Sequence, residues 1–324
     1  MTRRGWTLFV AISIIWGIPY LLIRVAVRDV QPGTLVFFRT VIGGLVLLPF
    51  VGRLGGFGPA LRRWRPLIAF TLIEIAAPWL MLADAERHLS SSVTAILVAM
   101  VPIVGVVLAR ALGSAERATR VQWLGLVLGV AGVGLLVGLD VGALDLVAVL
   151  EVGVVVVGYA VGPVIQARYL ADTPALPIVA ACLLLAAAGY LPYAAMHLPH
   201  SLAGTQIAAI VTLGAVCTAV AFVVFFALIS EIGPARATVI AQVNPAVAVL
   251  LGVVFLGEAF TLGMAVGFPM IIIGSVLAAR RAPARAAVDQ SIRTVPVAVA
   301  NTAATRPVSC SDGSSQSTST SSSG

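Results

Sequence analysis

Long apolar runs alternate along the chain with short polar segments in which arginine is frequent. A helix needs about 20 mostly apolar residues to cross the hydrocarbon core of a bilayer. The pattern therefore predicts an all-α integral membrane protein with ten transmembrane helices. Their predicted ranges are 6–27, 33–52, 66–84, 91–111, 121–139, 144–163, 177–197, 206–229, 236–257 and 261–279.

The composition supports this prediction. Of the 324 residues, 60% are hydrophobic and 10% are charged, whereas a soluble domain has about 45–50% apolar and about 25% charged residues. A chain of this composition needs lipid around it, which excludes a soluble enzyme, a secreted disulfide scaffold and a disordered regulator. The three cysteines show no metal-binding spacing, and we expect neither a metal nor a cofactor.

The placement of arginine predicts the orientation of the chain. All 20 basic residues are Arg, against 13 acids, which gives a formal net charge of +7. With the N-terminus inside, the predicted cytoplasmic segments hold fourteen Arg and the outside loops hold Arg28 and Arg87, as the positive-inside rule requires. Both termini are therefore expected in the cytoplasm and the protein in the plasma membrane. The basic surplus lies between spans rather than in a polar domain, so no nucleic-acid partner is expected.

The end of the chain differs in composition from the rest. From about residue 283 it is rich in Ala, Pro and Thr, and it finishes in a run of Ser and Thr. Such a segment has no apolar face to bury. We expect residues 283–324 to form a disordered, Ser/Thr-rich cytoplasmic tail, with a regulatory role as the alternative.

The chain contains an internal duplication. Glu116 and Glu258 stand 142 positions apart within two similar segments, and Pro102 and Pro245 of the same segments stand 143 apart. A second copy of five spans enters the membrane the other way up, because five is odd. This predicts two inverted five-helix repeats, an architecture shared by many secondary transporters. The predicted repeats are residues 6–139 and 144–280.

Several segments resemble one family of membrane carriers. They are WGIPYLLIRVAV in the first predicted helix, FFR at 37–39, the stretch from Pro102 to Glu116, and GPARATVIAQVNPAVAVLLGVVFLGEAFTLGMAVG at 233–267. Over about residues 6–280 the chain resembles EamA-type transporters of the drug/metabolite transporter superfamily. The resemblance implies a ten-helix carrier of small metabolites that works by alternating access without ATP. Asn244 stands where this family often carries Glu, which leaves the substrate open.

Three ionisable residues within the predicted spans are candidates for a solute site. Charged groups at membrane depth are expensive and commonly functional. Glu74 lies near the middle of its span, while Arg39 lies six and Glu151 about seven residues from the predicted outer ends of theirs. We expect Glu74 and Glu151 to line a solute or proton site with Arg39 as counter-charge. Ion pairs that only hold helices together are the alternative.

Amide and aromatic side chains complete the predicted site. Gln242 and Asn244 flank the bend expected at Pro245, where their amides can bind a polar solute or join helices. Four aromatic residues within the spans are candidates to line a mostly apolar solute chamber, although aromatic residues also occur at membrane interfaces. They are Trp16, Tyr20, Trp79 and Tyr159.

Two further patterns are expected to be structural. Glu116 and Glu258 each precede a loop, where a carboxylate can fix the turn into the next helix. Spacings of small residues, such as Gly125-xxx-Gly129, let helices approach closely.

These residues favour a secondary active transporter that exports a small metabolite such as an amino acid, with coupling to protons left open. A multidrug or toxic-compound exporter of the same fold is the alternative, and a membrane-embedded enzyme or a channel is a more distant one. The sequence contains no ATP-binding or hydrolase motif, so we do not expect an enzyme. The expected partners are a small-molecule solute and the lipid bilayer, with the protein as a monomer or homodimer.

Overall fold

The computed structural model describes residues 2–111, 119–139, 145–233 and 240–279, and every regular element in these ranges is a helix. The predicted tail and Glu116 lie outside them. The first half contains α1 (Arg3–Ala26), α2 (Pro32–Arg53), α3 (Gly58–Arg62), α4 (Trp64–Phe70), η1 (Thr71–Ala76), α5 (Ala77–His88), α6 (Ser91–Val98), α7 (Val101–Ala111) and α8 (Arg120–Leu139). The second half contains α9 (Leu146–Tyr169), α10 (Ala175–Met196), α11 (Gly204–Gly214), η2 (Ala215–Val220), α12 (Ala221–Ile232), α14 (Ile240–Leu256) and α15 (Leu262–Ala279).

Seven helical stretches are long and apolar enough to cross a membrane. Three of them are made of consecutive elements: Trp64–His88 from α4 to α5, Ser91–Leu108 from α6 to α7, and Gly204–Ile232 from α11 to α12. Three shorter apolar helices, within α8, α14 and α15, add to these. Large apolar side chains such as Val127 and Phe255 are exposed on the outer faces, which suits a lipid surrounding.

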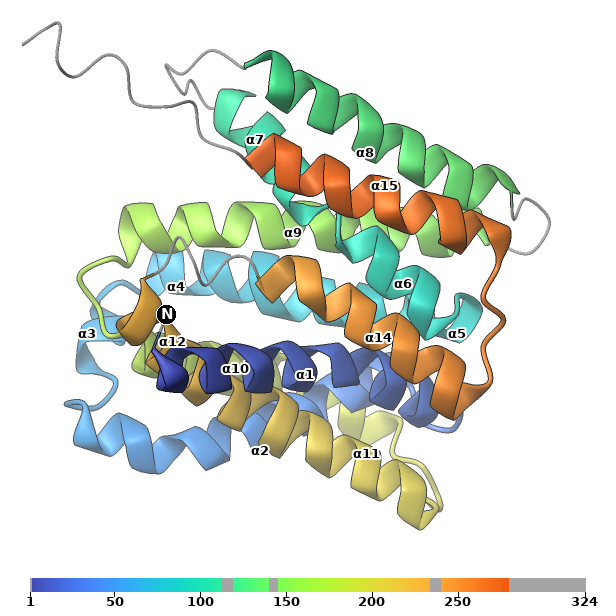
Figure 1. Ribbon diagram of the computed structural model, residues 1–324. Helices are drawn as coiled ribbons and strands as arrows, with labels where there is room; N and C mark the ends of the chain where they lie inside the picture. The colour runs from blue at the N-terminus through green and yellow to red at the C-terminus, as the bar shows by residue number, and fades with distance from the viewer. Residues whose placement is uncertain (1, 112–118, 140–144, 234–239, 280–324) are drawn as a thin grey trace, which may run out of the picture. The chain divides into compact units, whose positions relative to one another are not determined.

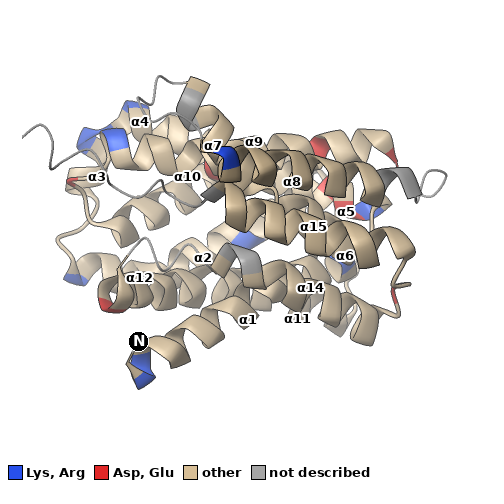
Figure 2. Ribbon diagram, turned by 45° about the horizontal axis from the view of Figure 1, so that its top comes forward, with Lys and Arg blue, Asp and Glu red and all other residues tan. Residues whose placement is uncertain are grey.

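Charged residues gather mainly at the ends of the helices, and the long middle parts carry few of them (Figure 2). From the end of α2 to the start of α4, for example, Arg53, Arg62 and Arg65 are exposed. Arg63 in the same region forms an ion pair with Asp172 at 2.9 Å. This distribution is typical of helices whose middle parts lie in an apolar phase.

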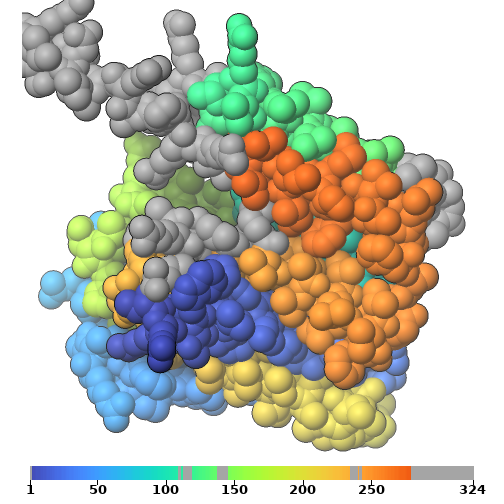
Figure 3. All heavy atoms as spheres, in the orientation of Figure 1, coloured from blue at the N-terminus to red at the C-terminus, as the bar shows by residue number. Residues whose placement is uncertain are grey.

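Glycine brings α8 and α15 into backbone contact. A Cβ atom at Gly125 would lie 2.5 Å from the Ala278 nitrogen, and one at Gly274 would lie 2.6 Å from the Gly129 nitrogen. Only glycine permits this approach, which is the packing role that the Gly125-xxx-Gly129 spacing predicts. The two helices run side by side (Figure 1), and their side chains lie against each other in the space-filling view (Figure 3).

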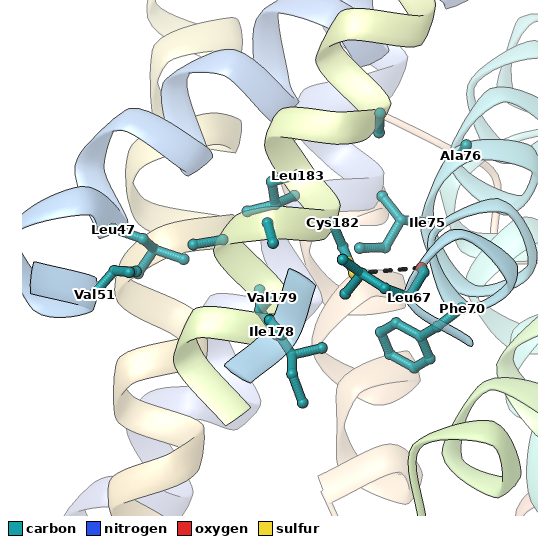
Figure 4. Packing of buried hydrophobic residues seen from close by; sticks show 14 of the residues in the cluster. Leu47, Val51, Leu67, Phe70, Ile75, Ala76, Ile178, Val179, Cys182 and Leu183 are labelled. Carbon is teal, nitrogen blue, oxygen red and sulfur yellow. Dashed lines mark hydrogen bonds between the residues drawn. The ribbon is translucent and has the colours of Figure 1, made fainter. Parts of the chain in front are cut away.

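A buried apolar cluster fixes α10 between α2 and α4. Figure 4 shows Leu47 of α2 on one side of Cys182 and Ile178 of α10, and Leu67 and Phe70 of α4 on the other. The Cys182 Sγ donates to the Leu67 carbonyl oxygen at 4.0 Å. The cluster contains no charged residue, so it orients these helices without using charged groups.

Two π-helical turns stand at matching places in the two halves. η1 and η2 each contain six residues, and they begin 144 positions apart. In η2 the Thr218 hydroxyl donates to the Leu213 carbonyl oxygen, five residues earlier, at 2.8 Å. A π turn changes the face that the following residues present, and such turns are frequent at functional sites. Each turn carries a residue of the candidate site, Glu74 in η1 and Thr218 in η2.

The proline positions singled out in the sequence differ between the halves. The interruption between α6 and α7 stands just before Pro102, which has no amide hydrogen to donate. There the Ala99 carbonyl oxygen accepts a hydrogen bond from the Ser275 hydroxyl of α15 at 2.8 Å. Pro245, at the matching place, lies inside the continuous helix α14. The helix is therefore interrupted before Pro102, whereas Pro245, where the sequence predicts a bend, causes no such interruption.

Candidate functional site

Arg39 places a charged group inside the helix bundle. Its side chain belongs to α2, and the residue is 8% exposed. Nε donates to Thr218 Oγ1 of η2 at 3.1 Å, and Cζ lies 3.6 Å from the ring centroid of Trp79 in α5. Among the residues that the structure describes, no carboxylate forms an ion pair with Arg39. Neutral groups, a hydroxyl oxygen and an aromatic face, therefore hold the guanidinium.

Two tyrosines add hydroxyl groups near this guanidinium. Tyr20 of α1 is buried and Tyr159 of α9 is partly buried, and both interact electrostatically with Arg39. Tyr159 also forms a hydrogen bond with the Trp79 side chain. We name the following five residues the Arg39 cluster: Tyr20, Arg39, Trp79, Tyr159 and Thr218. They come from α1, α2, α5, α9 and η2, so both halves of the chain contribute.

Glu74 of η1 is seated against glycine of α9. A Cβ atom at Gly162 would lie 1.7 Å from Glu74 Oε2 and 2.6 Å from its Cδ, so the carboxyl group occupies the space that a side chain there would fill. Gly158, one turn earlier, lets the Ile73 carbonyl oxygen approach to 2.5 Å from the position of a Cβ. Oε2 of Glu74 is buried without a hydrogen-bond partner in the described ranges. Because Glu74 also interacts electrostatically with Tyr159, it lies beside the Arg39 cluster.

Glu151 is not brought together with Arg39. Its carboxyl group forms a hydrogen bond with Asp84 and interacts electrostatically with His88 and Asp145. His88 Nδ1 lies 3.7 Å from Asp145 Oδ2 in the same group. Glu151 stands close to the start of α9 and faces the C-terminal end of α5, so the predicted counter-charge arrangement with Arg39 is not seen.

Trp16 belongs to a separate aromatic group. Its ring centroid lies 4.7 Å from that of Phe225 and 6.0 Å from that of Phe222, both in α12. Phe226 also belongs to the group, because its ring centroid lies 5.7 Å from that of Phe225. Within the described part of the chain, no ring contact joins Trp16 to the Arg39 cluster.

Asn244 forms a contact between helices. One terminal atom of its side-chain amide lies 3.2 Å from the Ser13 carbonyl oxygen and 3.1 Å from the Ile240 carbonyl oxygen, and the hydrogen-bond pattern assigns this atom as the nitrogen, which donates to both. The amide thereby joins α14 to α1, which is the helix-joining alternative considered for it. The side chain of Gln242 lies outside the described residues.

Known proteins share this arrangement of helices. A model of the EamA-like transporter family matches residues 3–138 and, a second time, residues 147–280. The chain belongs to the EamA-like transporter family. It is therefore a membrane transporter with multiple apolar helices, in agreement with the resemblance found in the sequence.

Individual relatives of this EamA-like transporter agree with the family assignment. The "Uncharacterized inner membrane transporter YedA" of Escherichia coli strain K12 is 31% identical over 265 residues, covering 76% of this chain and 81% of YedA. YedA of Escherichia coli O157:H7 matches with the same identity and coverage. One solved crystal structure covers 86% of this chain and 97% of its own chain at 20% identity, with a TM-score of 0.62. That structure shows a shared fold.

Two polar residues of the EamA-like transporter are missing from the sequence-based prediction. Thr218 is a neutral residue in a long apolar run, and nothing in its surroundings marks it. Glu86 falls in a predicted loop, because the third predicted span ends at residue 84, whereas α5 continues to His88. A helical pattern could have revealed it: Glu86 follows Trp79 by seven positions, which is two turns along one helix face.

Proposed function

We propose that this transporter is a secondary carrier that exports a small metabolite, such as an amino acid, by alternating access. The observation that carries the proposal is the surroundings of Arg39, whose close partners in the described ranges are the Thr218 hydroxyl and the Trp79 ring. A buried charge is stable only when it is paired or strongly hydrogen-bonded. A carboxylate on the solute would supply the missing opposite charge.

The Arg39 cluster has suitable chemistry for a small organic anion. A guanidinium binds a carboxylate through two parallel N–H···O bonds, and the engagement of Nε by Thr218 leaves the two terminal nitrogens for the solute. Trp79, Tyr20 and Tyr159 provide aromatic faces and hydroxyl groups for the rest of it. Since the cluster draws on both halves, a movement of one half against the other would open it to alternate sides.

Glu74 is the second charged group that we assign to the solute path. Its Oε2 is buried without a described partner, and the carboxyl group interacts electrostatically with Tyr159 of the Arg39 cluster. The ammonium group of an amino acid, or a proton, would satisfy that oxygen. Trp16, Glu151, Gln242 and Asn244 stay predictions as lining residues in other states of the carrier.

The architecture we propose is ten membrane-spanning helices in two inverted five-helix repeats, residues 6–139 and 144–280. The two family matches and the two π turns at matching places support the duplication. The distribution of arginine supports cytoplasmic termini. The printed description of YedA as an inner membrane transporter supports a location in the plasma membrane. The tail from residue 283 is proposed to be a disordered cytoplasmic segment.

Transport by the purified protein in proteoliposomes tests the function. The panel consists of labelled amino acids and other small carboxylates, measured by counterflow with and without an imposed pH gradient. Charge-assisted hydrogen bonds contribute about 1.5–3 kcal/mol, so Arg39→Gln should raise KM by about tenfold or more. Arg28→Gln, at an exposed arginine, is the control and should behave like the wild type. Unchanged KM in Arg39→Gln, or no transport of any panel solute by the wild type, would overturn the proposal.

A second candidate function is export of larger aromatic compounds. The group of Trp16, Phe222, Phe225 and Phe226 favours it, because stacked and edge-on rings suit aromatic solutes. Adding labelled aromatic cations to the panel separates the two functions. Transport of these cations that is insensitive to Arg39→Gln but lost in Trp16→Ala would support the drug exporter instead.

A further inference from the structure

Glu86 is a buried acid that the solute site does not use. It lies near the C-terminal end of α5. The next two residues, Arg87 and His88, are exposed, whereas Glu86 is 0% exposed. Both of its carboxyl oxygens are buried without a hydrogen-bond partner among the described residues. A carboxylate in such surroundings would be an uncompensated charge, which is among the most unfavourable arrangements in a protein interior.

The groups around Glu86 come from several elements. α1 contributes Tyr20 and Arg24, α2 contributes Arg39, and the segment between α14 and α15 contributes Glu258; these are the charged or titratable groups in the described ranges that act on its carboxyl group. The Arg24 guanidinium donates through Nη1 to the backbone carbonyl oxygen of Glu86 rather than to its carboxyl group. The nearest cation is therefore directed at the backbone.

Glu258 is the second acid of this group, and both of its carboxylate oxygens accept hydrogen bonds from other residues. Its Oε1 accepts from the Ser91 amide at 2.7 Å, and its Oε2 accepts from the Ser92 amide at 3.0 Å and from the Ser92 hydroxyl. These amides form the first turn of α6, so the N-terminus of a helix stabilises the Glu258 carboxylate. Gly252 makes the space, because a Cβ there would lie 2.4 Å from Glu258 Oε2.

No cation in the described ranges forms an ion pair with the Glu86 carboxyl group. Arg24 is directed at the backbone of Glu86, and Arg39 is held by Thr218 and Trp79. An ionised Glu86 would add one negative charge to a closed, apolar interior. Water could solvate that charge only if α1, α5 and α6 moved apart.

We propose that Glu86 is the proton-binding group of a gate at this end of the transporter. A proton on its carboxyl group allows α1, α5 and α6 to close, and release of the proton to water accompanies opening. The inference rests on the proposed function as a carrier, because it assigns the coupling of protons to one gate of that carrier. Glu74 would then bind the solute, and Glu86 would control the opening of the path to the solute site.

Accessibility of the gate tests the proposal without any solute. Leu89, 1% exposed at the end of α5, is replaced by cysteine in a full-length variant whose native cysteines are alanine. The rate of labelling by a membrane-impermeant maleimide is measured in proteoliposomes from acidic to alkaline pH and divided by the rate for a cysteine at exposed Arg28, because thiolate formation alone speeds the reaction as pH rises. We expect this ratio to increase as pH rises, and Glu86→Gln to keep it low at every pH. Glu231→Gln, which removes an acid from the end of α12, should leave the pH dependence intact.

The outcomes separate this inference from the proposed function. Wild-type pH dependence of labelling in Glu86→Gln would overturn the gate, whether or not a solute has been found. Loss of pH dependence in Glu86→Gln with no transport of any panel solute would support the gate and contradict the carrier. If Glu86→Gln does not fold, Glu86→Asp serves instead: it keeps an acid, so labelling should still depend on pH with a shifted midpoint, and an unshifted midpoint would overturn the gate.

Discussion

The Arg39 guanidinium lies over the Trp79 ring, with its central carbon 3.6 Å from the ring centroid. This contact joins α2 to α5, while the bond from Arg39 Nε to Thr218 joins α2 to η2. The ring face and the hydroxyl together fix the plane of the guanidinium. A solute carboxylate would therefore meet donors that are already oriented, which lowers the entropy lost on binding.

Replacing Trp79 tests how much the ring holds Arg39 in place. A desolvated cation–π contact contributes about 2 kcal/mol. Trp79→Phe should therefore raise KM for a transported carboxylate modestly, and Trp79→Leu should raise it by about tenfold or more. KM and maximal rate are measured in proteoliposomes for each variant.

The matched control is Trp123→Leu on α8, where the tryptophan is 59% exposed and should not affect KM. If Trp79→Leu and Trp123→Leu both leave KM unchanged, Trp79 is a packing residue only. A change in maximal rate alone would place Trp79 in the conformational step rather than in binding.

Gly162→Ala tests the seat of the Glu74 carboxyl group. The added methyl group would stand where Glu74 Oε2 lies, 1.7 Å from the position of the new Cβ. Overpacking of this kind costs about 1–3 kcal/mol, so the variant should unfold at lower temperature in detergent and transport more slowly. In a Glu74→Ala background the same change should cost much less, because Cδ and both oxygens are gone.

Gly153→Ala in the same helix is the control, because nothing lies within 4 Å of a Cβ there. It should be neutral or slightly stabilising, since alanine favours helix more than glycine does. Equal destabilisation by Gly162→Ala with and without Glu74 would show that the carboxyl group does not occupy this space.

The helices were largely predictable because apolar runs of about 20 residues have few other stable structures in lipid. The site was less predictable. Arg39 and Thr218 are 179 positions apart, and the direction in which Thr218 points depends on a π turn that the pattern does not reveal. Glu151 lies on a face of α9 that meets Asp84 of α5, and hydropathy carries no information about which helices are neighbours.

Glu258 binds the N-terminus of α6 instead of the turn into the next helix, α15, that the sequence predicts for it. Its carboxylate accepts from two amides and a hydroxyl at the start of α6, so Glu258→Ala leaves buried donors without a partner. Each such loss costs about 1–3 kcal/mol, and the unfolding temperature should fall clearly. Glu258→Gln keeps one acceptor oxygen, so its unfolding temperature should fall less than that of Glu258→Ala.

For this variant Glu231→Gln is the control, since Glu231 accepts one hydrogen bond, from Thr2, at an exposed place. Its unfolding temperature should match the wild type. A neutral effect of Glu258→Ala would mean that water replaces the carboxylate at the α6 N-terminus.

Ser275→Ala tests whether a hydrogen bond from α15 stabilises the helix break before Pro102. Its hydroxyl is 0% exposed and donates to the Ala99 carbonyl oxygen at 2.8 Å, which joins α15 to the interruption between α6 and α7. Ser275→Ala leaves that carbonyl unsatisfied in an apolar interior, at about 1–3 kcal/mol, so the unfolding temperature in detergent should drop. Ser230→Ala on α12 removes only an exposed bond within its own helix, to the Ala227 carbonyl oxygen, and should have little effect. Equal unfolding temperatures for the two variants would show that the Ser275 hydroxyl does not stabilise the break.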